Sequence, residues 1–142
     1  MTEIAIRVAA AATLMWLGMV LAISFLEAPL KFRAEGLELA VGLAIGRVVF
    51  RALNSVELIW AVVIATCLIL GGPSSPLVAV GAGIAVLLTV QLLFVQPRLN
   101  RRSAYVLAGH EAPRSRAHHA YIGLEVLKAA ALVVLGAALL AA

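Results

Sequence analysis

Apolar residues along this chain gather in four long, nearly uncharged stretches, separated by shorter segments rich in Arg, Gly and Pro. A helix that crosses a hydrocarbon core about 30 Å thick needs about 20 such residues, and each stretch is close to this length. The pattern predicts helices at about residues 5–27, 53–70, 77–96 and 118–141. Pro29 and Pro97 are expected to end the first and the third helix, because proline interrupts a helix.

The segment at about residues 37–52 is mostly apolar, but it contains Gly42, Gly46, Arg47 and Arg51. A helix running from there to the Gly/Pro turn at 71–76 would measure about 50 Å, which is too long for one crossing. We expect this segment to lie along the cytoplasmic interface as an amphipathic helix. The alternative is a second helix that projects well beyond the lipid.

The composition places the chain in the membrane class. Hydrophobic residues make up 64% of it, charged residues 13%, and the mean hydropathy is +1.10, far from the composition of soluble domains. The first apolar stretch is long for a signal peptide, so we expect it to be retained as a helix. The predicted fold class is all-α: an integral membrane four-helix bundle, a single transmembrane domain over residues 1–142, with an interfacial helix between helices one and two.

Basic residues are concentrated in two of the connections. They are Lys31, Arg33, Arg47 and Arg51 between helices one and two, and Arg98, Arg101, Arg102, Arg114 and Arg116 between helices three and four. Lys and Arg near helix ends mark the cytoplasmic side. The pattern predicts a multi-pass protein of the bacterial inner membrane with both termini outside the cytoplasm. Its partner is then the lipid bilayer, and nucleic acid is not expected.

Three polar residues fall at one depth in three different helices. Glu57, Gln91 and Lys128 each lie 14 residues from the helix end at the far face, a rise of roughly 21 Å. All three would sit some 9 Å inside the opposite face of the hydrocarbon core. Charges at such a depth are costly and normally face the bundle interior. Together with Glu125, they predict a partly polar chamber in the cytoplasmic half.

The fourth helix places four polar side chains on one face. His118, Tyr121, Glu125 and Lys128 follow at spacings of three, four and three, which a helix brings to the same side. Two interpretations stay open: a structural Glu125–Lys128 pair, or a ligand or proton site.

A second candidate site lies where the second helix begins. Arg47, Arg51 and Asn54 occupy a narrow angular sector, and the two arginines suit an anion because a guanidinium can engage a carboxylate or phosphate through two donors. Structural alternatives are contact with lipid headgroups and neutralisation of Glu57 and Glu27.

No catalytic residue can be assigned, and the chain is more simply interpreted as a non-enzyme. The histidines His110, His118 and His119 lack the spacing of a metal or haem site, so no metal ligand or cofactor is predicted. Haem and glutathione are kept only as alternatives.

Three strings in the chain, Phe25 to Phe32, Ile45 to Phe50 and His118 to Lys128, resemble small bacterial four-helix membrane proteins of the transmembrane-protein-205-like group. This resemblance implies a fold more than a function. The series Arg51-Ala-Leu-Asn54-Ser-Val-Glu57 also resembles the Arg, Asn and Glu that open the second helix of the MAPEG family, although the Arg-to-Asn spacing differs by one residue. The second resemblance implies a trimer that binds glutathione at a subunit boundary.

The favoured hypothesis is an integral membrane protein that binds a small molecule or ion, or that serves as an assembly module. The alternative is a MAPEG-like glutathione-dependent membrane enzyme. Because a single bundle of this size offers little room for a transport pathway, we expect a homo-oligomer or a membrane partner.

Overall fold

The computed structural model describes residues 2–72, 74–111 and 116–142, and every regular element in these ranges is a helix. Arg114 and Pro73, which belong to the predicted basic connection and turn, lie outside the described residues. The helical segments form four long rods, and all four are long and apolar enough to cross a membrane. The segments are α1 (Glu3–Val20), η1 (Leu21–Glu27) and α2 (Ala28–Lys31) in the first rod, α3 (Leu39–Leu70) in the second, α4 (Ser75–Val90), η2 (Gln91–Val95) and α5 (Gln96–Leu107) in the third, and α6 (Arg116–Leu140) in the fourth.

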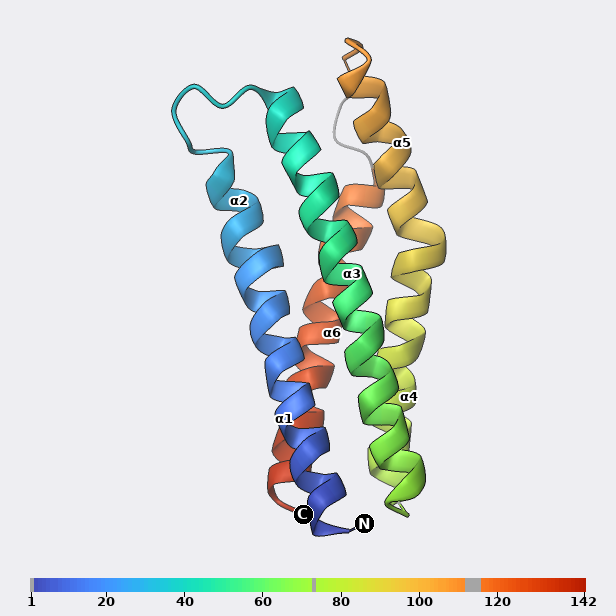
Figure 1. Ribbon diagram of the computed structural model, residues 1–142. Coiled ribbons are helices and arrows are strands. Elements are labelled where there is room, and N and C mark those ends of the chain that lie inside the picture. Colours follow the sequence, from blue (N-terminus) through green and yellow to red (C-terminus); the bar gives the residue numbers. More distant parts are fainter. Residues whose placement is uncertain (1, 73, 112–115) are drawn as a thin grey trace.

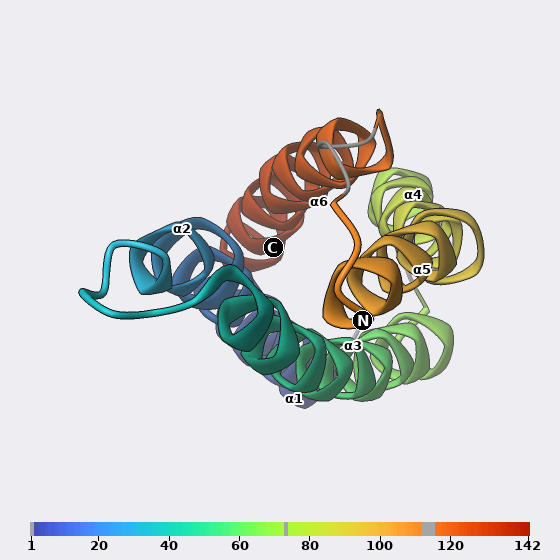
Figure 2. The ribbon, with the colours of Figure 1, turned by 90° about the horizontal axis from the view of Figure 1, so that it is seen from above.

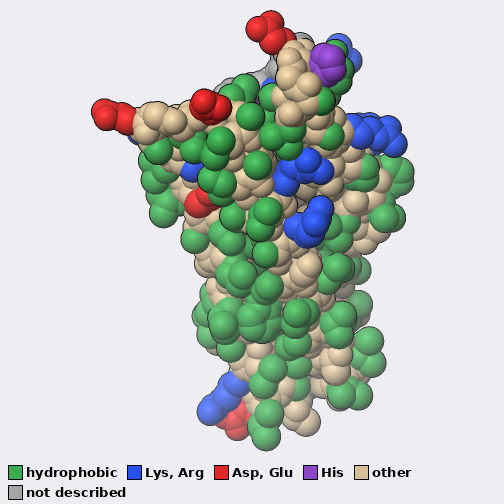
Figure 3. Space-filling model, turned by 45° about the horizontal axis from the view of Figure 1, so that its top comes forward, with side chains coloured by type: hydrophobic (Ala, Val, Ile, Leu, Met, Phe, Trp, Pro, Cys, Tyr) green, Lys and Arg blue, Asp and Glu red, His purple; other side chains and the backbone are tan. Residues whose placement is uncertain are grey.

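The four rods stand side by side and form one bundle (Figures 1 and 2). Helix α1 packs against α3 and α6, while the third rod packs against α6 through α4 and against α3 through α5. Both termini lie at one end, together with the α3–α4 turn. The α2–α3 connection and the C-terminal end of α5 lie at the other, which we call the basic end. Figure 3 shows Lys and Arg side chains gathered there, above a body covered by hydrophobic ones.

The expected break before the second helix is absent, because α3 is a single helix from Leu39 to Leu70. The segment at about 37–52 is therefore not a separate helix, and its length of 32 residues corresponds to about 48 Å. A glycine within a helix costs only about 1 kcal/mol relative to alanine, and tertiary contact easily offsets this. A Cβ at Gly42 would collide with the Phe32 ring, and one at Gly46 would lie 3.1 Å from Lys31 Nζ. These glycines permit close packing instead of ending the helix.

The predicted helix ends at Pro29 and Pro97 are also wrong. Each proline follows a π-helical turn, η1 or η2, by two residues. The N–H groups of Ala28 and Gln96 reach back five residues, to the carbonyls of Ile23 and Gln91, and the wider turn accommodates the proline ring. The helix then continues, so residues 98–107, expected as a loop, belong to α5.

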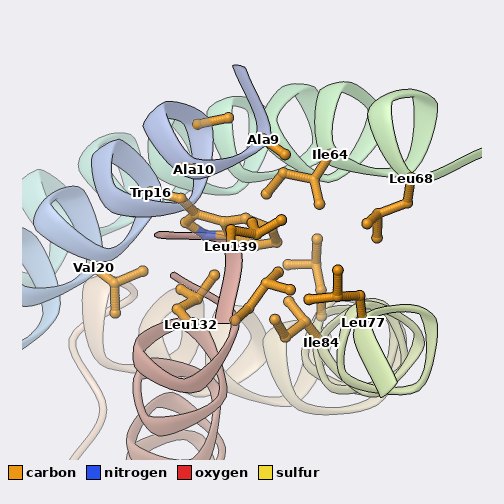
Figure 4. Close-up of a cluster of buried hydrophobic side chains, with 13 residues drawn as sticks. Ala9, Ala10, Trp16, Val20, Ile64, Leu68, Leu77, Ile84, Leu132 and Leu139 are labelled. Carbon is orange, nitrogen blue, oxygen red and sulfur yellow. The ribbon is translucent and has the colours of Figure 1, made fainter. Parts of the chain in front are cut away.

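The apolar core fills the half of the bundle that holds the termini (Figure 4). Small residues on α1, such as Ala9 and Ala12, are fully buried and let this helix approach its neighbours. Trp16, Leu132 and Leu135 fill the centre. The polar side chains described next lie at the upper boundary of this core, toward the basic end.

Candidate functional site: a buried ionic cluster

Five polar groups from all four rods meet inside the bundle. We call Glu57, Gln91, Glu125, Lys128 and Trp16 the buried ionic cluster; their exposed fractions are 1%, 3%, 1%, 0% and 1%. Helix α3 supplies Glu57, η2 supplies Gln91, α6 supplies Glu125 and Lys128, and α1 supplies Trp16. The common depth of Glu57, Gln91 and Lys128, predicted from residue counts, is confirmed by direct contact between their side chains.

The Lys128 ammonium lies between two carboxylates. Its Nζ forms ion pairs with Oε1 of Glu57 and, at 2.5 Å, with Oε1 of Glu125. It also donates a hydrogen bond to Oε1 of Gln91 at 2.8 Å. An ammonium has three N–H donors, and these three acceptors use all of them.

The Gln91 amide and the Trp16 indole complete the network. Gln91 Nε2 donates to Glu125 Oε1 at 2.6 Å, so one amide binds both the ammonium and a carboxylate. Trp16 Nε1 donates to Glu57 Oε1 at 2.9 Å. The second oxygen of Glu125, Oε2, is buried and has no hydrogen-bond partner among the described residues. That oxygen is the one unsatisfied acceptor of this carboxylate.

The cluster is unbalanced in charge. When all groups are ionised, two carboxylates and one ammonium carry a net charge of −1, and Gln91 and Trp16 are neutral. Breaking or unbalancing a buried ion pair costs several kcal/mol. The arrangement therefore favours uptake of one positive charge.

A second layer of polar groups lies next to the cluster, toward the basic end. Tyr121 is one turn before Glu125 on α6 and is 8% exposed; its ring packs edge-on against Phe50 at a centroid distance of 5.5 Å. The hydroxyl oxygens of Tyr121 and Ser24 are both buried; they lie close to each other, but their geometry falls short of a regular hydrogen bond. Buried hydroxyls without a well-formed hydrogen bond are unusual in folded proteins, so this layer is a candidate path between the cluster and the basic end.

The other predicted site residues lie elsewhere. Arg47, Arg51 and Asn54 line a separate cleft between α3 and α5. His118 is half-buried at the start of α6, and its ring contacts that of His119 at 5.9 Å. Glu57 does not line the cleft of Arg51 and Asn54, so the series that resembles the MAPEG motif is divided between two places in this chain.

The predicted chamber is closed by its own side chains. Glu57, Gln91, Glu125 and Lys128 contact one another directly, and these contacts occupy the space between the helices. Over the described ranges, no group of three His, Cys, Asp or Glu side chains is placed to hold a metal ion.

Sequence reasoning did not single out Trp16, although this residue lies 13 residues from Glu3, a rise of about 20 Å, and so matches the depth of the polar layer. Gln96 and Asn100 were also missed, because Gln96 was expected to end the third helix and Asn100 to lie in the loop after it; both line the cleft with the arginines.

Comparison with known proteins finds no family model, no curated protein and no solved structure that significantly matches this chain. The two family resemblances rest on the quoted residues alone, and function must be argued from the cluster itself.

Proposed function

We propose that this chain is a multi-pass membrane protein whose buried ionic cluster reversibly binds a single proton, which makes it an ion-binding module. Insertion in the membrane is supported by the outward faces of the rods. Large apolar side chains such as Ile59, Val86 and Val133 are 59%, 61% and 53% exposed, and surfaces this apolar suit acyl chains better than water. With the bacterial inner membrane as its location, the basic end faces the cytoplasm.

The observation that carries the proposal is the position of Lys128 between Glu57 and Glu125. One ammonium cannot neutralise two carboxylates. In a bilayer the remaining negative charge costs more than at an aqueous surface, and one proton removes it. Protonation of either carboxyl leaves the other paired with Lys128, so either carboxyl is able to hold that proton.

Reversible exchange requires a route between the cluster and water, and the cluster lies nearer the cytoplasmic face than the outer face. It lies some 9 Å inside the cytoplasmic face by helix rise, with the Tyr121 and Ser24 hydroxyls adjacent to it on that side. Hydroxyl groups donate and accept protons and suit a short relay. On this proposal the proton exchanges with the cytoplasmic side.

Infrared difference spectroscopy of the reconstituted protein tests the proposal. A change from alkaline to mildly acidic pH, at which exposed glutamates stay ionised, should produce the carbonyl band of one protonated carboxyl. That band should shift or vanish in Glu57→Gln and Glu125→Gln. Glu35→Gln, an exposed carboxyl in the α2–α3 connection, is the matched control and should leave the band unchanged. A cluster whose spectrum is the same at every pH would be a fixed structural pair, contrary to the proposal.

The glutathione-dependent enzyme has less support as an alternative. It needs Arg51, Asn54 and Glu57 in one site, whereas the Glu57 carboxylate is engaged by Lys128 and Trp16. An oligomer in which subunits share a site would still require Glu57 to leave these partners.

A further inference from the structure

A polar cleft of about 170 Å³ lies between α3 and α5, apart from the buried ionic cluster. Helix α3 contributes two arginines one turn apart, and α5 faces them with two amides. Its polar lining residues are Arg47, Arg51, Asn54, Ser55, Gln96 and Asn100. No Asp or Glu is among the described residues that line it.

The positive charges of the two cleft arginines are not neutralised by any described side chain. Neither the Arg47 nor the Arg51 guanidinium makes a hydrogen bond or an ion pair within the described part of the chain. By contrast, Lys31 on the neighbouring α2 pairs with Glu27, and Arg98 on α5 donates to the carbonyl of Phe94. The cleft therefore offers two positive charges that nothing in its lining neutralises.

The amides around the arginines add neutral donors. Gln96 Nε2 donates to Asn100 Oδ1 at 3.4 Å, which leaves the Asn100 amide nitrogen available as a donor. Asn54 makes no side-chain hydrogen bond among the described residues, so its amide is available too. Two guanidinia and two amide groups present more donors than the two oxygens of a carboxylate can use. A phosphate group, with more oxygens, matches them better.

The volume limits what can enter. Pockets for drug-sized ligands measure roughly 300–1,000 Å³, so 170 Å³ suits one small anionic group and not a whole cofactor. We propose that the cleft between α3 and α5 binds a single phosphate group, either the headgroup phosphate of an anionic lipid or soluble phosphate.

The height of the cleft favours lipid as the source of that phosphate, a step that rests on the proposed membrane insertion. Arg51 lies six residues before Glu57 on α3, about 9 Å nearer the basic end. This brings its Cα to the edge of the hydrocarbon core, with Arg47 one turn further out. Anionic headgroups of the cytoplasmic leaflet lie at this level and attract Lys and Arg.

Two binding measurements on the full chain test the site and separate the sources. In the first, nanodiscs containing phosphatidylglycerol or only phosphatidylcholine receive the protein, and lipid retention is measured by native mass spectrometry. In the second, inorganic phosphate is titrated calorimetrically in neutral detergent. The Arg47→Gln/Arg51→Gln double variant should weaken binding about tenfold or more, because two charge-assisted hydrogen-bond partners are lost. Arg101→Gln, an exposed arginine on α5 outside the cleft, should change it less than about twofold.

A loss confined to phosphatidylglycerol assigns the phosphate to lipid, and a loss with inorganic phosphate assigns it to a soluble ligand. Asn100→Asp places a negative charge inside the cleft and should weaken binding as strongly as the double variant. Equal binding by the double variant, Asn100→Asp and Arg101→Gln in both measurements would overturn the site. None of these variants alters the carboxyls of the infrared experiment, so the two proposals fail independently.

Discussion

Lys128 Nζ and Gln91 Oε1 lie 2.8 Å apart, although 37 residues separate them along the chain. The same Gln91 amide donates to Glu125, and Gln91 is the residue at which the π-helical turn η2 begins. π turns in helices are frequent at functional sites. The turn η2 allows the helix to continue beyond Pro97, and it also supplies Gln91 to the ionic cluster.

Lys128→Met should destabilise the protein by about 3 kcal/mol or more, because it leaves two carboxylates without their shared cation. The loss should be smaller in Glu57→Gln and Glu125→Gln backgrounds. Unfolding in mild detergent measures both effects. Lys31→Met, which removes a 3.5 Å pair of a partly buried lysine, is the control and should cost about 1 kcal/mol or less. Strictly additive losses in both double-mutant cycles would argue against the shared cation.

Gln91→Leu should cost about 1–3 kcal/mol, because the ammonium and Glu125 each lose a hydrogen bond that water cannot replace. Gln96→Leu, the matched change at a half-buried glutamine five residues nearer the basic end, should stay within about 0.5 kcal/mol. Thermal unfolding of the two variants side by side is sufficient. If both lose the same amount, the amide at position 91 has no special role.

The two tryptophans offer an internal comparison. Trp16→Phe removes an N–H that donates to the Glu57 carboxylate, and we expect a loss of about 1.5–3 kcal/mol. Trp60→Phe removes an indole N–H that is buried and has no hydrogen-bond partner in the described part of the chain, so the change relieves an unsatisfied donor and should cost less. Chemical unfolding monitored by far-UV circular dichroism ranks the two. The reverse order would mean that the Trp16 hydrogen bond contributes little.

Maleimide labelling of single cysteines, introduced in a Cys67→Ser background, tests the proposed topology. A cysteine at Glu35, in the α2–α3 connection, should resist an impermeant maleimide in intact cells and react after the membrane is opened. One at Ala142 should react in intact cells, since both termini lie at the opposite end of the bundle from that connection. The opposite labelling of the two sites would invert the orientation and place the cluster near the outer face.

The sequence was sufficient to predict the four long helices and the polar layer, because helix rise and periodicity depend on local geometry alone. The depth count correctly brought Glu57, Gln91 and Lys128 together. The separate helix expected at about residues 37–52 is wrong, since α3 runs through this segment. Crossing of a bilayer and both family resemblances stay predictions.

What the sequence did not reveal depends on tertiary contact. Pro29 and Pro97 were expected to end helices, but whether a proline ends a helix depends on whether the preceding turn can widen. Gly42 suggested a break in the helix. The sequence does not show that the Phe32 ring packs against this glycine, because that contact forms only in the folded chain. The α5 residues that face Arg51 across the cleft were missed for a related reason, because most of α5 was expected to be a loop.

The central claim, one exchangeable proton in the buried ionic cluster, is tested most directly by counting protons. Unbuffered nanodiscs with the wild-type protein and with the Glu57→Gln variant, whose cluster keeps one carboxylate and one ammonium, are titrated from mildly alkaline to mildly acidic pH. The account predicts that the wild type takes up one more proton per chain than this variant. Superimposable titration curves would contradict it.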